Sequence, residues 1–533
     1  MPGGGRNGRY LRHLRERAAA GARPAKVRPV PAADGGGARR RADWRGALVR
    51  AVIYIAIVAV PLCIAMRYQW LPNDDALRHA AHALQPDRPW GDIVVLREGM
   101  TENLHPGWEA VLRTVHRATG GDAAFLVVSA YIGLFTLFCL LPVPLMRRPE
   151  GWMAALFLAS LAMENTFVFR LMRGRPYLFS MAVLLAVLMA GRGSCGRWPS
   201  AWKTAVFFAA GALVAAVHGA ALPLFALAVL AFALAGEWRT AAAMAVAGAL
   251  GILAGAAVVA GTAGAWPYLR EQALHVLHSF GHGTAVSSLV GEFQPYRSMR
   301  HVVALTGLVA CVRRLATGRW PAWPGRDPLC AAAALGGLAG LHVYRFWMDF
   351  GVPAWLLWMA FEIEASLEAL DAAGRRRLAV AVVAALGFWL HATADTGGRW
   401  GGRVAPDAKP FAPDGAAEDE TEAAEARADW EPGSGGIVYA DAMSVFYRWY
   451  WANPDAPWRY MLAFESGVMP EEDLAVYRAM QRSGFTPESY RPWMRKMRPE
   501  DRFVVTQRGP EAFPELEWRH MGGVEWIGRL PRD

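Results

Sequence analysis

The chain has 533 residues, of which 54% are hydrophobic and only 19% are charged. Soluble globular domains carry about a quarter charged residues, so this composition excludes an ordinary soluble protein and predicts that lipid surrounds much of the chain. The net charge of +10 comes almost entirely from arginine, which is typical of a GC-rich genome and indicates a bacterial protein.

The five cysteines lie in apolar stretches or in one short loop beside arginines, and no two form a CxxC pair. The sequence therefore indicates neither a disulfide framework nor a zinc site. We expect no cofactor, and a divalent metal is not indicated although it stays open. The chain also has no Walker motif, no GxGxxG motif after a predicted strand and no GxSxG motif, so it shows no nucleotide-binding or esterase signature.

Residues 1–46 form a tail rich in Gly, Pro, Ala and Arg, which we expect to be disordered and cytoplasmic. Its arginines are interpreted as an orientation signal with some attraction to anionic membrane lipids, in preference to a nucleic-acid-binding segment. The first apolar stretch follows directly and lacks a small-residue cleavage site. It therefore predicts a membrane anchor rather than a removable signal peptide.

Apolar stretches close to the length of a membrane span recur over residues 47–395. We count about eleven, at about 48–66, 122–146, 151–167, 177–190, 203–217, 220–235, 240–260, 301–314, 328–343, 351–367 and 377–394. With the N-terminus in the cytoplasm, the arginine-rich loops between them all fall on the cytoplasmic side, as the positive-inside rule expects. The sequence thus predicts an α-helical polytopic membrane protein of the bacterial inner membrane, whose C-terminus lies outside the cytoplasm.

The composition changes twice after the last predicted span. Residues 396–435 are rich in Gly, Pro and acidic residues, which predicts a flexible linker without a core. Residues 436–533 are typical of a small extracytoplasmic α/β domain, with strands at 436–441, 459–464 and 502–506 and an amphipathic helix at 471–482. The aromatic stretch 446–451 is either a partner-binding surface or a core or membrane-resting helix, and the second interpretation is favoured.

Two adjacent carboxylates, Asp74 and Asp75, follow the first predicted span by a few residues. Such a pair suits metal binding or general-base catalysis, because closeness to lipid and to each other is expected to raise the pKa of one of them. The structural alternative is that one of the two is the N-cap of a helix over 76–84. The dipeptide His105-Pro106 stands before the second predicted span.

Three arginines, Arg170, Arg173 and Arg175, lie between the third and fourth predicted spans, on the side that the positive-inside rule disfavours. Arg170 and Arg173 would share one face if the segment is helical, and Pro176 then redirects the chain. Arginine can hold two phosphate oxygens at once, so the cluster predicts a phosphate or pyrophosphate site. The alternatives are anchoring to lipid headgroups and pairing with Glu164.

Each of the other outward turns adds an imidazole or a charge. His218 follows the fifth predicted span, and Arg345 and Asp349 lie in the last outward turn. The outward loop at 266–300 carries His275, His278 and His282, whose spacings fit an interfacial helix as well as a metal site. Because the inward loops hold little besides arginine, the sequence predicts a site that faces out of the cytoplasm.

This order of features resembles the GT-C superfamily of polytopic glycosyltransferases over about residues 48–394. The resemblance is carried by Asp74-Asp75, by His105-Pro106 and by the Arg173-Gly174-Arg175-Pro176-Tyr177 turn. It implies an enzyme that takes a sugar from a polyprenyl-phosphate carrier and transfers it, outside the cytoplasm, to a lipid, glycan or protein acceptor. The outer domain has no WWD-like motif, so the resemblance does not extend to peptide glycosylation.

The resemblance also implies roles for individual residues. Asp74 or Asp75 would be the catalytic base, the position that is a metal ligand in the oligosaccharyltransferase branches. The residues expected to bind the substrate or its phosphate are His105, Arg170, Arg173, Arg175, His218 and Arg345. Transfer with inversion needs one carboxylate to deprotonate an acceptor hydroxyl while cations hold the departing phosphate, which fits these residue types.

Two further functions stay open from the sequence. The chain could be a transporter or flippase for lipid-linked intermediates, or a scaffold whose outer domain binds a partner. A transporter is expected to show a polar pathway through the membrane, often with broken helices and internal repeats, and the sequence shows neither. We therefore predict a glycosyltransferase whose partners are the lipid-linked sugar donor, membrane lipids and an extracytoplasmic acceptor, with no nucleic acid.

Overall fold

The computed structural model describes residues 36–98, 105–194, 196–281, 294–296, 299–371, 376–396, 398–400, 429–522 and 525–531. The chain divides into two compact units, 1–47 and 48–533, and the description below concerns the second. Most of the expected linker, together with Glu102 and His282, lies outside the described residues, as do the side chains of Glu164, His275 and His278.

Helices occupy the predicted apolar stretches in chain order. They are α2 (Gly36–Tyr68), α5 (Ala123–Leu140), α6 (Glu150–Ala162), α8 (Pro176–Gly191), α9 (Ala201–Val217), α10 (Leu222–Leu234), α11 (Trp238–Gly281), α12 (Met299–Thr317), α13 (Pro328–Gly340), α15 (Val352–Leu370) and α16 (Arg377–Thr393). A helix is expected of such apolar runs, because it satisfies every backbone polar group within the segment. The mostly helical fold is confirmed.

Among the described residues, three helical stretches are long and apolar enough to cross a bilayer: Trp44–Tyr68, Ala123–Leu140 and Trp238–Leu274. Six more apolar helices have 10–17 residues, namely α6, α8, α9, α10, α13 and α16. The total of about eleven spans is therefore still a prediction.

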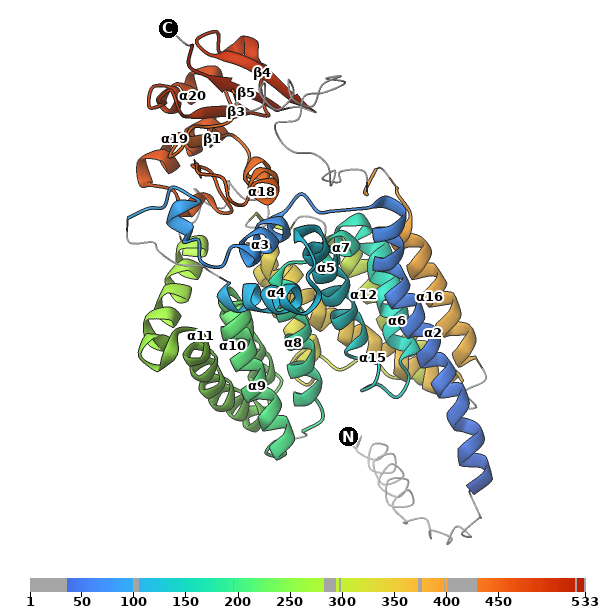
Figure 1. Ribbon diagram of the computed structural model, residues 1–533. Coiled ribbons are helices and arrows are strands. Elements are labelled where there is room, and N and C mark those ends of the chain that lie inside the picture. Colours follow the sequence, from blue (N-terminus) through green and yellow to red (C-terminus); the bar gives the residue numbers. More distant parts are fainter. Residues whose placement is uncertain are drawn as a thin grey trace, which may run out of the picture. The chain divides into compact units, whose positions relative to one another are not determined.

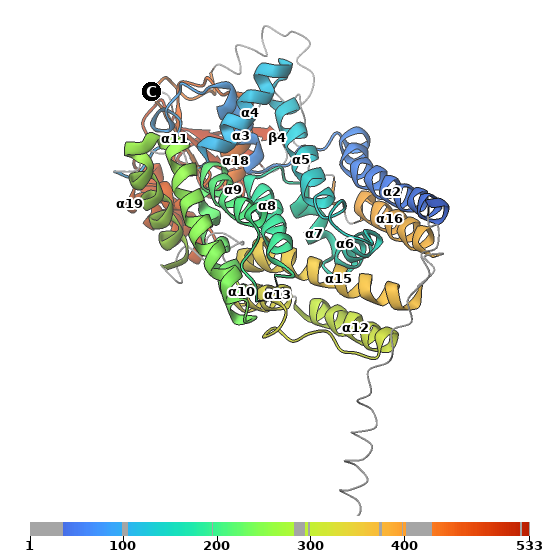
Figure 2. The same ribbon diagram turned by 90° about the horizontal axis from the view of Figure 1, so that it is seen from below.

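The helices pack closely along one another (Figures 1 and 2). Helix α9 packs along α11, α6 contacts α15 and α16, and α12 packs on α15. Glycines allow the α9–α11 contact: a Cβ added to Gly251 would lie 2.0 Å from the carbonyl oxygen of Phe208, and one added to Gly255 would lie 2.1 Å from that of Ala212. Small residues at such interfaces let helix backbones touch, which is how helices associate where no water drives them together.

Polar contacts gather the loops into two groups. One group joins helices through the predicted inward arginines: Arg377 pairs with Glu150 at 2.7 Å, and Arg313 with Glu362 at 2.9 Å. The other group joins turns predicted to face out, for example through a hydrogen bond of 2.9 Å from the Tyr68 hydroxyl to the carbonyl oxygen of residue 393. Each of these contacts joins segments that the arginine pattern assigns to the same side of the membrane.

Two shorter helices, α3 (Asp75–Leu84) and α4 (Pro106–Thr119), lie between α2 and α5. Helix α3 packs against α4, α5 and, from the C-terminal domain, α18 (Met443–Ala452). Asp74 is the N-cap of α3, and its side chain accepts a hydrogen bond of 2.6 Å from the backbone N–H of Asp75. The N-cap interpretation is thus confirmed for Asp74.

Helix α11 corrects one prediction. We expected a loop from residue 266, but the chain stays helical to Gly281. Gly261 interrupts the helix with a φ of 73°, a left-handed conformation that glycine adopts at little cost, and the following residues begin a second helical segment. The expected loop at 266–281 is therefore wrong, because a single glycine kink does not end the helix-forming pattern.

The C-terminal domain is an α/β fold, as predicted. Its sheet has the strand order β2-β1-β3-β5-β4, in which β1 (Ile437–Ala440) is parallel to both β2 (Arg459–Tyr460) and β3 (Arg502–Val505). Strands β4 (Glu517–Gly522) and β5 (Glu525–Arg529) form an antiparallel pair that the sequence pattern did not predict. The helices are α18, α19 (Glu471–Arg482) and α20 (Pro487–Met494), and strand β2 is shorter than the predicted 459–464.

Helix α18 contains the aromatic stretch 446–451. Phe446, Trp449 and Tyr450 are buried in it, so their interpretation as core residues is confirmed. Beside this helix, the domain is joined to the loop between α3 and α4: Val94 forms a parallel β-bridge with Tyr460. Arg88 donates hydrogen bonds of 2.5 Å to the carbonyl oxygens of residues 454 and 456.

Candidate active site

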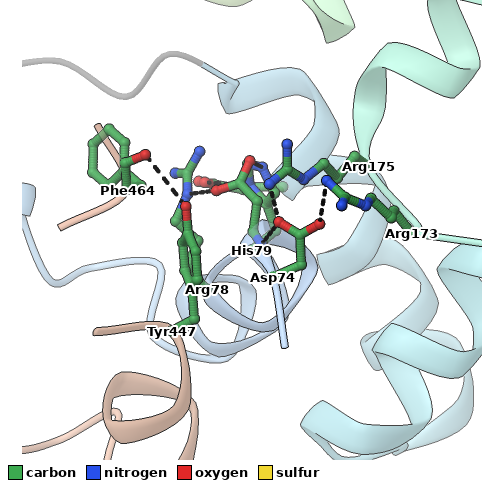
Figure 3. A network of polar contacts seen from close by, with 9 residues as sticks. Asp74, Arg78, His79, Arg173, Arg175, Tyr447 and Phe464 are labelled. Carbon is green, nitrogen blue, oxygen red and sulfur yellow. Dashed lines mark hydrogen bonds and ion pairs between the residues drawn. The ribbon is translucent and has the colours of Figure 1, made fainter. Parts of the chain in front are cut away.

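Asp74 lies between two arginines at the start of α3 (Figure 3). Its Oδ2 is 3.2 Å from Nη1 of Arg173, and its Oδ1 pairs with Nη2 of Arg175. The Asp74 side chain is only 9% exposed, whereas Arg173 is 28% exposed and can meet a ligand. The structure therefore brings together one carboxylate and two of the three arginines that the sequence predicted to form a site.

The turn before α8 explains why only two arginines meet Asp74. Helix α7 (Glu164–Leu171) ends before Arg173, so Arg170 and Arg173 do not share a helix face and that expectation is wrong. Gly174 then turns the chain with a φ of 65°, where a Cβ would lie 3.2 Å from the backbone nitrogen of Tyr131. Pro176 starts α8, as expected of a proline at the first helical position.

Asp75 has its own partners within α3. Arg78 donates from Nε to its Oδ1, and Nε2 of His79 lies 3.4 Å from its Oδ2. Burial alone would raise the pKa of Asp75, but the charges of Arg78 and His79 and their hydrogen bonds lower it well below its ordinary value. We expected a raised pKa for one acid of the pair, and for Asp75 the shift is in the opposite direction because two cation-forming groups face it.

Glu109, in the first turn of α4, closes the network behind His79. Its Oε1 is 3.3 Å from Nδ1 of His79, and its Oε2 is 2.6 Å from Nδ1 of His82. Burial would raise the pKa of Glu109, but hydrogen bonds from His79 and His82 and their charges lower it to about 2. The His79 imidazole thus lies between two carboxylates, the partly exposed Asp75 and the buried Glu109.

His105 and His218 stand beside this network. The His105 ring centroid is 5.2 Å from that of His79 and 5.1 Å from that of His218. His218 also contacts the Ser180 hydroxyl through Nδ1 at 2.9 Å. Burial lowers the pKa of His105 well below its ordinary value, and the charges of His218 and His79 act in the same direction. His105 therefore lies beside His79, and His218 lies on the far side of His105.

Arg170 and Arg345 meet at a second carboxylate, Asp349. Nη2 of Arg170 is 2.5 Å from Oδ1 of Asp349, and Nε of Arg345 is 3.3 Å from its Oδ2. Asp349 stands in a single turn of π-helix, η4 (Trp347–Gly351), a wide turn that is frequent at functional sites. The Arg170 guanidinium also lies 4.1 Å from the ring centroid of Tyr177. The predicted phosphate-binding arginines are thus divided between Asp74 and Asp349.

The C-terminal domain contributes residues next to Asp75. The Arg78 guanidinium lies 4.1 Å from the ring centroid of Phe464, and the Tyr447 hydroxyl donates to the backbone oxygen of Phe464 at 3.3 Å (Figure 3). The sequence places Phe464 and Tyr447 in the outer domain but does not connect them to the acids. Arg78, His79 and Glu109 are site residues that the sequence did not predict. The three- and four-residue steps from Asp75 to Arg78 and His79 signal one helix face, whereas no such signal marks Glu109.

A metal site is not evident at this position. Within the ranges that the structure describes, no three or more His, Cys, Asp or Glu side chains are grouped so that they could hold a metal ion. The acids and imidazoles are instead engaged with arginines and with one another, as the contacts above show.

No protein-family model and no curated protein matches the chain. Among solved structures, it is similar to the Archaeoglobus fulgidus oligosaccharyltransferase in complex with Zn and sulfate, with a TM-score of 0.46 and 12% identity over 85% of this chain and 68% of that chain. It is also similar to the arabinofuranosyltransferase AftD from Mycobacteria, with a TM-score of 0.39 and 14% identity over 93% of this chain and 40% of that chain. Both are GT-C proteins, the superfamily that the sequence motifs resemble. Because both TM-scores are below 0.5, the proposals that follow rest on this chain's own residues.

Proposed function

We propose that this chain is an inverting membrane glycosyltransferase that moves a sugar from a polyprenyl-phosphate carrier to an extracytoplasmic acceptor. The observation that carries the proposal is the pairing of Asp74 with Arg173 and Arg175, directly beside Asp75. A transferase of this kind needs a carboxylate base next to cations that hold a leaving phosphate, and these four side chains supply both.

In the proposed reaction Asp75 is the base. Its carboxylate takes the proton of an acceptor hydroxyl as the hydroxyl oxygen attacks the anomeric carbon of the sugar. The bond from that carbon to the phosphate oxygen breaks, and the polyprenyl phosphate leaves with the bonding electrons. Its increased negative charge is held by Arg173 and Arg175, since guanidinium groups bind phosphate oxygens in pairs. A single displacement of this kind inverts the sugar's configuration.

Asp74 is assigned a different role because its carboxylate caps α3 and bridges the two arginines. Oδ1 accepts the Asp75 N–H and pairs with Arg175, while Oδ2 pairs with Arg173. It thus fixes the start of α3 and holds the two guanidinium groups extended toward the position of the phosphate. An arriving phosphate carries more negative charge than one carboxylate and would draw both groups onto itself.

The remaining predicted binders are assigned by their surroundings. His105 lies beside His79, and His218 lies beside His105, so both stay in the proposed substrate site. Arg345, which is 21% exposed, can still reach a ligand. Arg170 is 4% exposed and paired with buried Asp349, so its proposed role is to support the fold around the site.

The proposed membrane arrangement follows from the apolar helices and from the two groups of loops. We propose about eleven spans in the bacterial inner membrane, a cytoplasmic N-terminus and an extracytoplasmic C-terminal domain. The acid pair, Arg173 and the residues of the C-terminal domain that meet them then lie on the outer face. This position suits a lipid-linked donor, whose tail stays in the bilayer while its phosphate lies at the headgroup level.

The function is tested with the full-length protein in detergent. Detergent micelles separate no compartments, so transport cannot take place in this assay. Synthetic short-chain polyprenyl-phosphate sugars are incubated with the protein and with glycan or lipid acceptors, and free polyprenyl phosphate is measured by mass spectrometry. Acceptor-dependent release is expected of a transferase. A flippase predicts no release in detergent. Comparing surface glycans of cells with and without the gene identifies the acceptor class.

A further inference from the structure

We infer that His79 receives the proton which Asp75 takes from the acceptor. Glu109 is the positioning residue, because it holds the His79 ring in place. The inference deepens the proposed function and rests on it. It assigns a reaction role to two buried residues, His79 and Glu109, that the displacement step itself does not use.

The geometry places His79 between two carboxylates. Its Nε2 lies 3.4 Å from Oδ2 of Asp75, and its Nδ1 lies 3.3 Å from Oε1 of Glu109. The four-residue step from Asp75 to His79 puts both on one face of α3, and α4 brings Glu109 against the far side of the ring. His79 is fully buried and Glu109 is 1% exposed, so water does not compete for these contacts.

Glu109 selects the form of the imidazole that can accept a proton. A carboxylate facing Nδ1 favours the tautomer with the hydrogen on that nitrogen, which leaves the lone pair of Nε2 directed at Asp75. The second oxygen of Glu109 is held by Nδ1 of His82 at 2.6 Å, and the His82 ring stacks on Trp90 at 4.4 Å between centroids. These contacts keep the Glu109 carboxylate from turning away.

The proton step is balanced without any other reactant. Asp75 first gains the acceptor's proton and becomes a neutral carboxyl group. The proton then passes from its Oδ2 to Nε2 of His79, and the carboxylate of Asp75 is restored. The resulting imidazolium lies between two carboxylates, Asp75 and Glu109, which stabilise its positive charge. After the products leave, the proton returns from Nε2 of His79 to Asp75, whose side chain is 14% exposed, and passes from there to solvent.

Such a relay is useful because of the neighbours of Asp75. Burial alone would raise the pKa of Asp75, but the charge and hydrogen bond of Arg78 lower it, so the carboxyl group holds a proton weakly once the acceptor has been deprotonated. An imidazole has an ordinary pKa more than two units above that of an aspartate and retains the proton more readily. The adjacent imidazole therefore takes up the proton that the Asp75 carboxyl group holds only weakly.

The test compares Glu109→Gln and His79→Asn in the full-length protein, using the donor assay described above. Glutamine keeps the size of Glu109 but removes its charge, and asparagine keeps a donor near the position of Nδ1 but has no counterpart of Nε2. Each change is expected to lower kcat by about tenfold to a hundredfold while the KM for the donor stays within about twofold. The double variant is expected to be no slower than the slower single variant, because both changes break one unit.

Glu150→Gln is the matched control. Glu150 is also fully buried in the first turn of a helix, but it pairs with Arg377 among the turns of the predicted inward group. A general effect of losing a buried carboxylate would appear in this variant too, whereas the relay predicts that its kcat is unchanged.

The outcomes separate the inference from the proposed function. Wild-type kcat in both Glu109→Gln and His79→Asn, with Asp75→Asn inactive, would overturn the relay and leave the function standing. Additive losses in the double variant would also overturn it. If Glu109→Gln fails to fold, His79→Asn still decides the matter. Normal transfer by Asp75→Asn would instead contradict the proposed base itself.

Discussion

Oδ2 of Asp74 lies 3.2 Å from Nη1 of Arg173, and this contact joins the start of α3 to the turn before α8. A phosphate bound by Arg173 must therefore compete with Asp74 for the guanidinium group. Donor binding and the conformation of the acid pair are coupled through this contact, because each state uses the same donor atoms.

Arg173→Lys and Arg175→Lys are expected to weaken use of the donor although the net charge is kept. Lysine is a point charge and cannot hold two phosphate oxygens in a fixed plane. Loss of one charge-assisted hydrogen bond should raise the KM for the donor about tenfold or more. The measurement is the transfer rate against donor concentration. Wild-type kinetics in both variants would mean that these arginines only anchor the protein to lipid headgroups.

Asp349→Ala is expected to destabilise the fold. The change removes a carboxylate partner from the buried Arg170, and breaking such a buried pair typically costs about 3–5 kcal/mol. The midpoint of thermal unfolding in detergent checks this. The double variant Arg170→Met with Asp349→Leu should recover most of the stability, because apolar groups of similar size replace the pair. If the single and double variants unfold at the same temperature, the pair is not the source of the effect.

Glu109 is expected to contribute fully to the stability of the fold above about pH 4.5 and progressively less below it. Its pKa is lowered from 4.5 to about 2, so its contribution is complete above the higher value and is lost as the pH falls toward the lower one. The unfolding midpoints of the wild type and of Glu109→Gln are compared from pH 6 to pH 3. The gap between them should narrow as the pH falls below about 4.5. A gap that widens there would contradict the assigned contacts.

Alkaline phosphatase fused after Asp533 is expected to be active, because the proposed topology puts the C-terminal domain outside the cytoplasm. A fusion after Gly318, which follows α12 in a predicted inward loop, is the matched control and is expected to be inactive. A C-terminal fusion that is well expressed but inactive would reverse the topology and with it the proposed outward site.

The sequence predicted the positions of the helices well, since apolar runs and helix caps are local signals. It predicted the helix that starts after Asp74 to within one residue. It also named the residues of the candidate site on both sides of the Asp74–Arg173 contact. Local signals failed where one residue decides the outcome, as at Gly261, where the helix kinks and then continues.

Pairings between distant residues could not be predicted in the same way. Which arginine meets which acid depends on where α7 ends, and that end separates Arg170 from Arg173. Glu109 resembles any acid in the first turn of a helix, where the helix dipole favours one, so nothing in the sequence marks it as the buried partner of His79. The contact of Phe464 with Arg78 depends on how the C-terminal domain packs on α3.

Asp75 is proposed as the base of a glycosyl transfer from a polyprenyl phosphate. The most direct measurement is kcat for acceptor-dependent release of polyprenyl phosphate by the purified wild type, Asp75→Asn and Asp74→Asn. The account predicts a loss of about a hundredfold or more in kcat for Asp75→Asn. For Asp74→Asn it predicts mainly a raised KM for the donor. Transfer by Asp75→Asn at the wild-type rate, with the protein folded, would contradict the account.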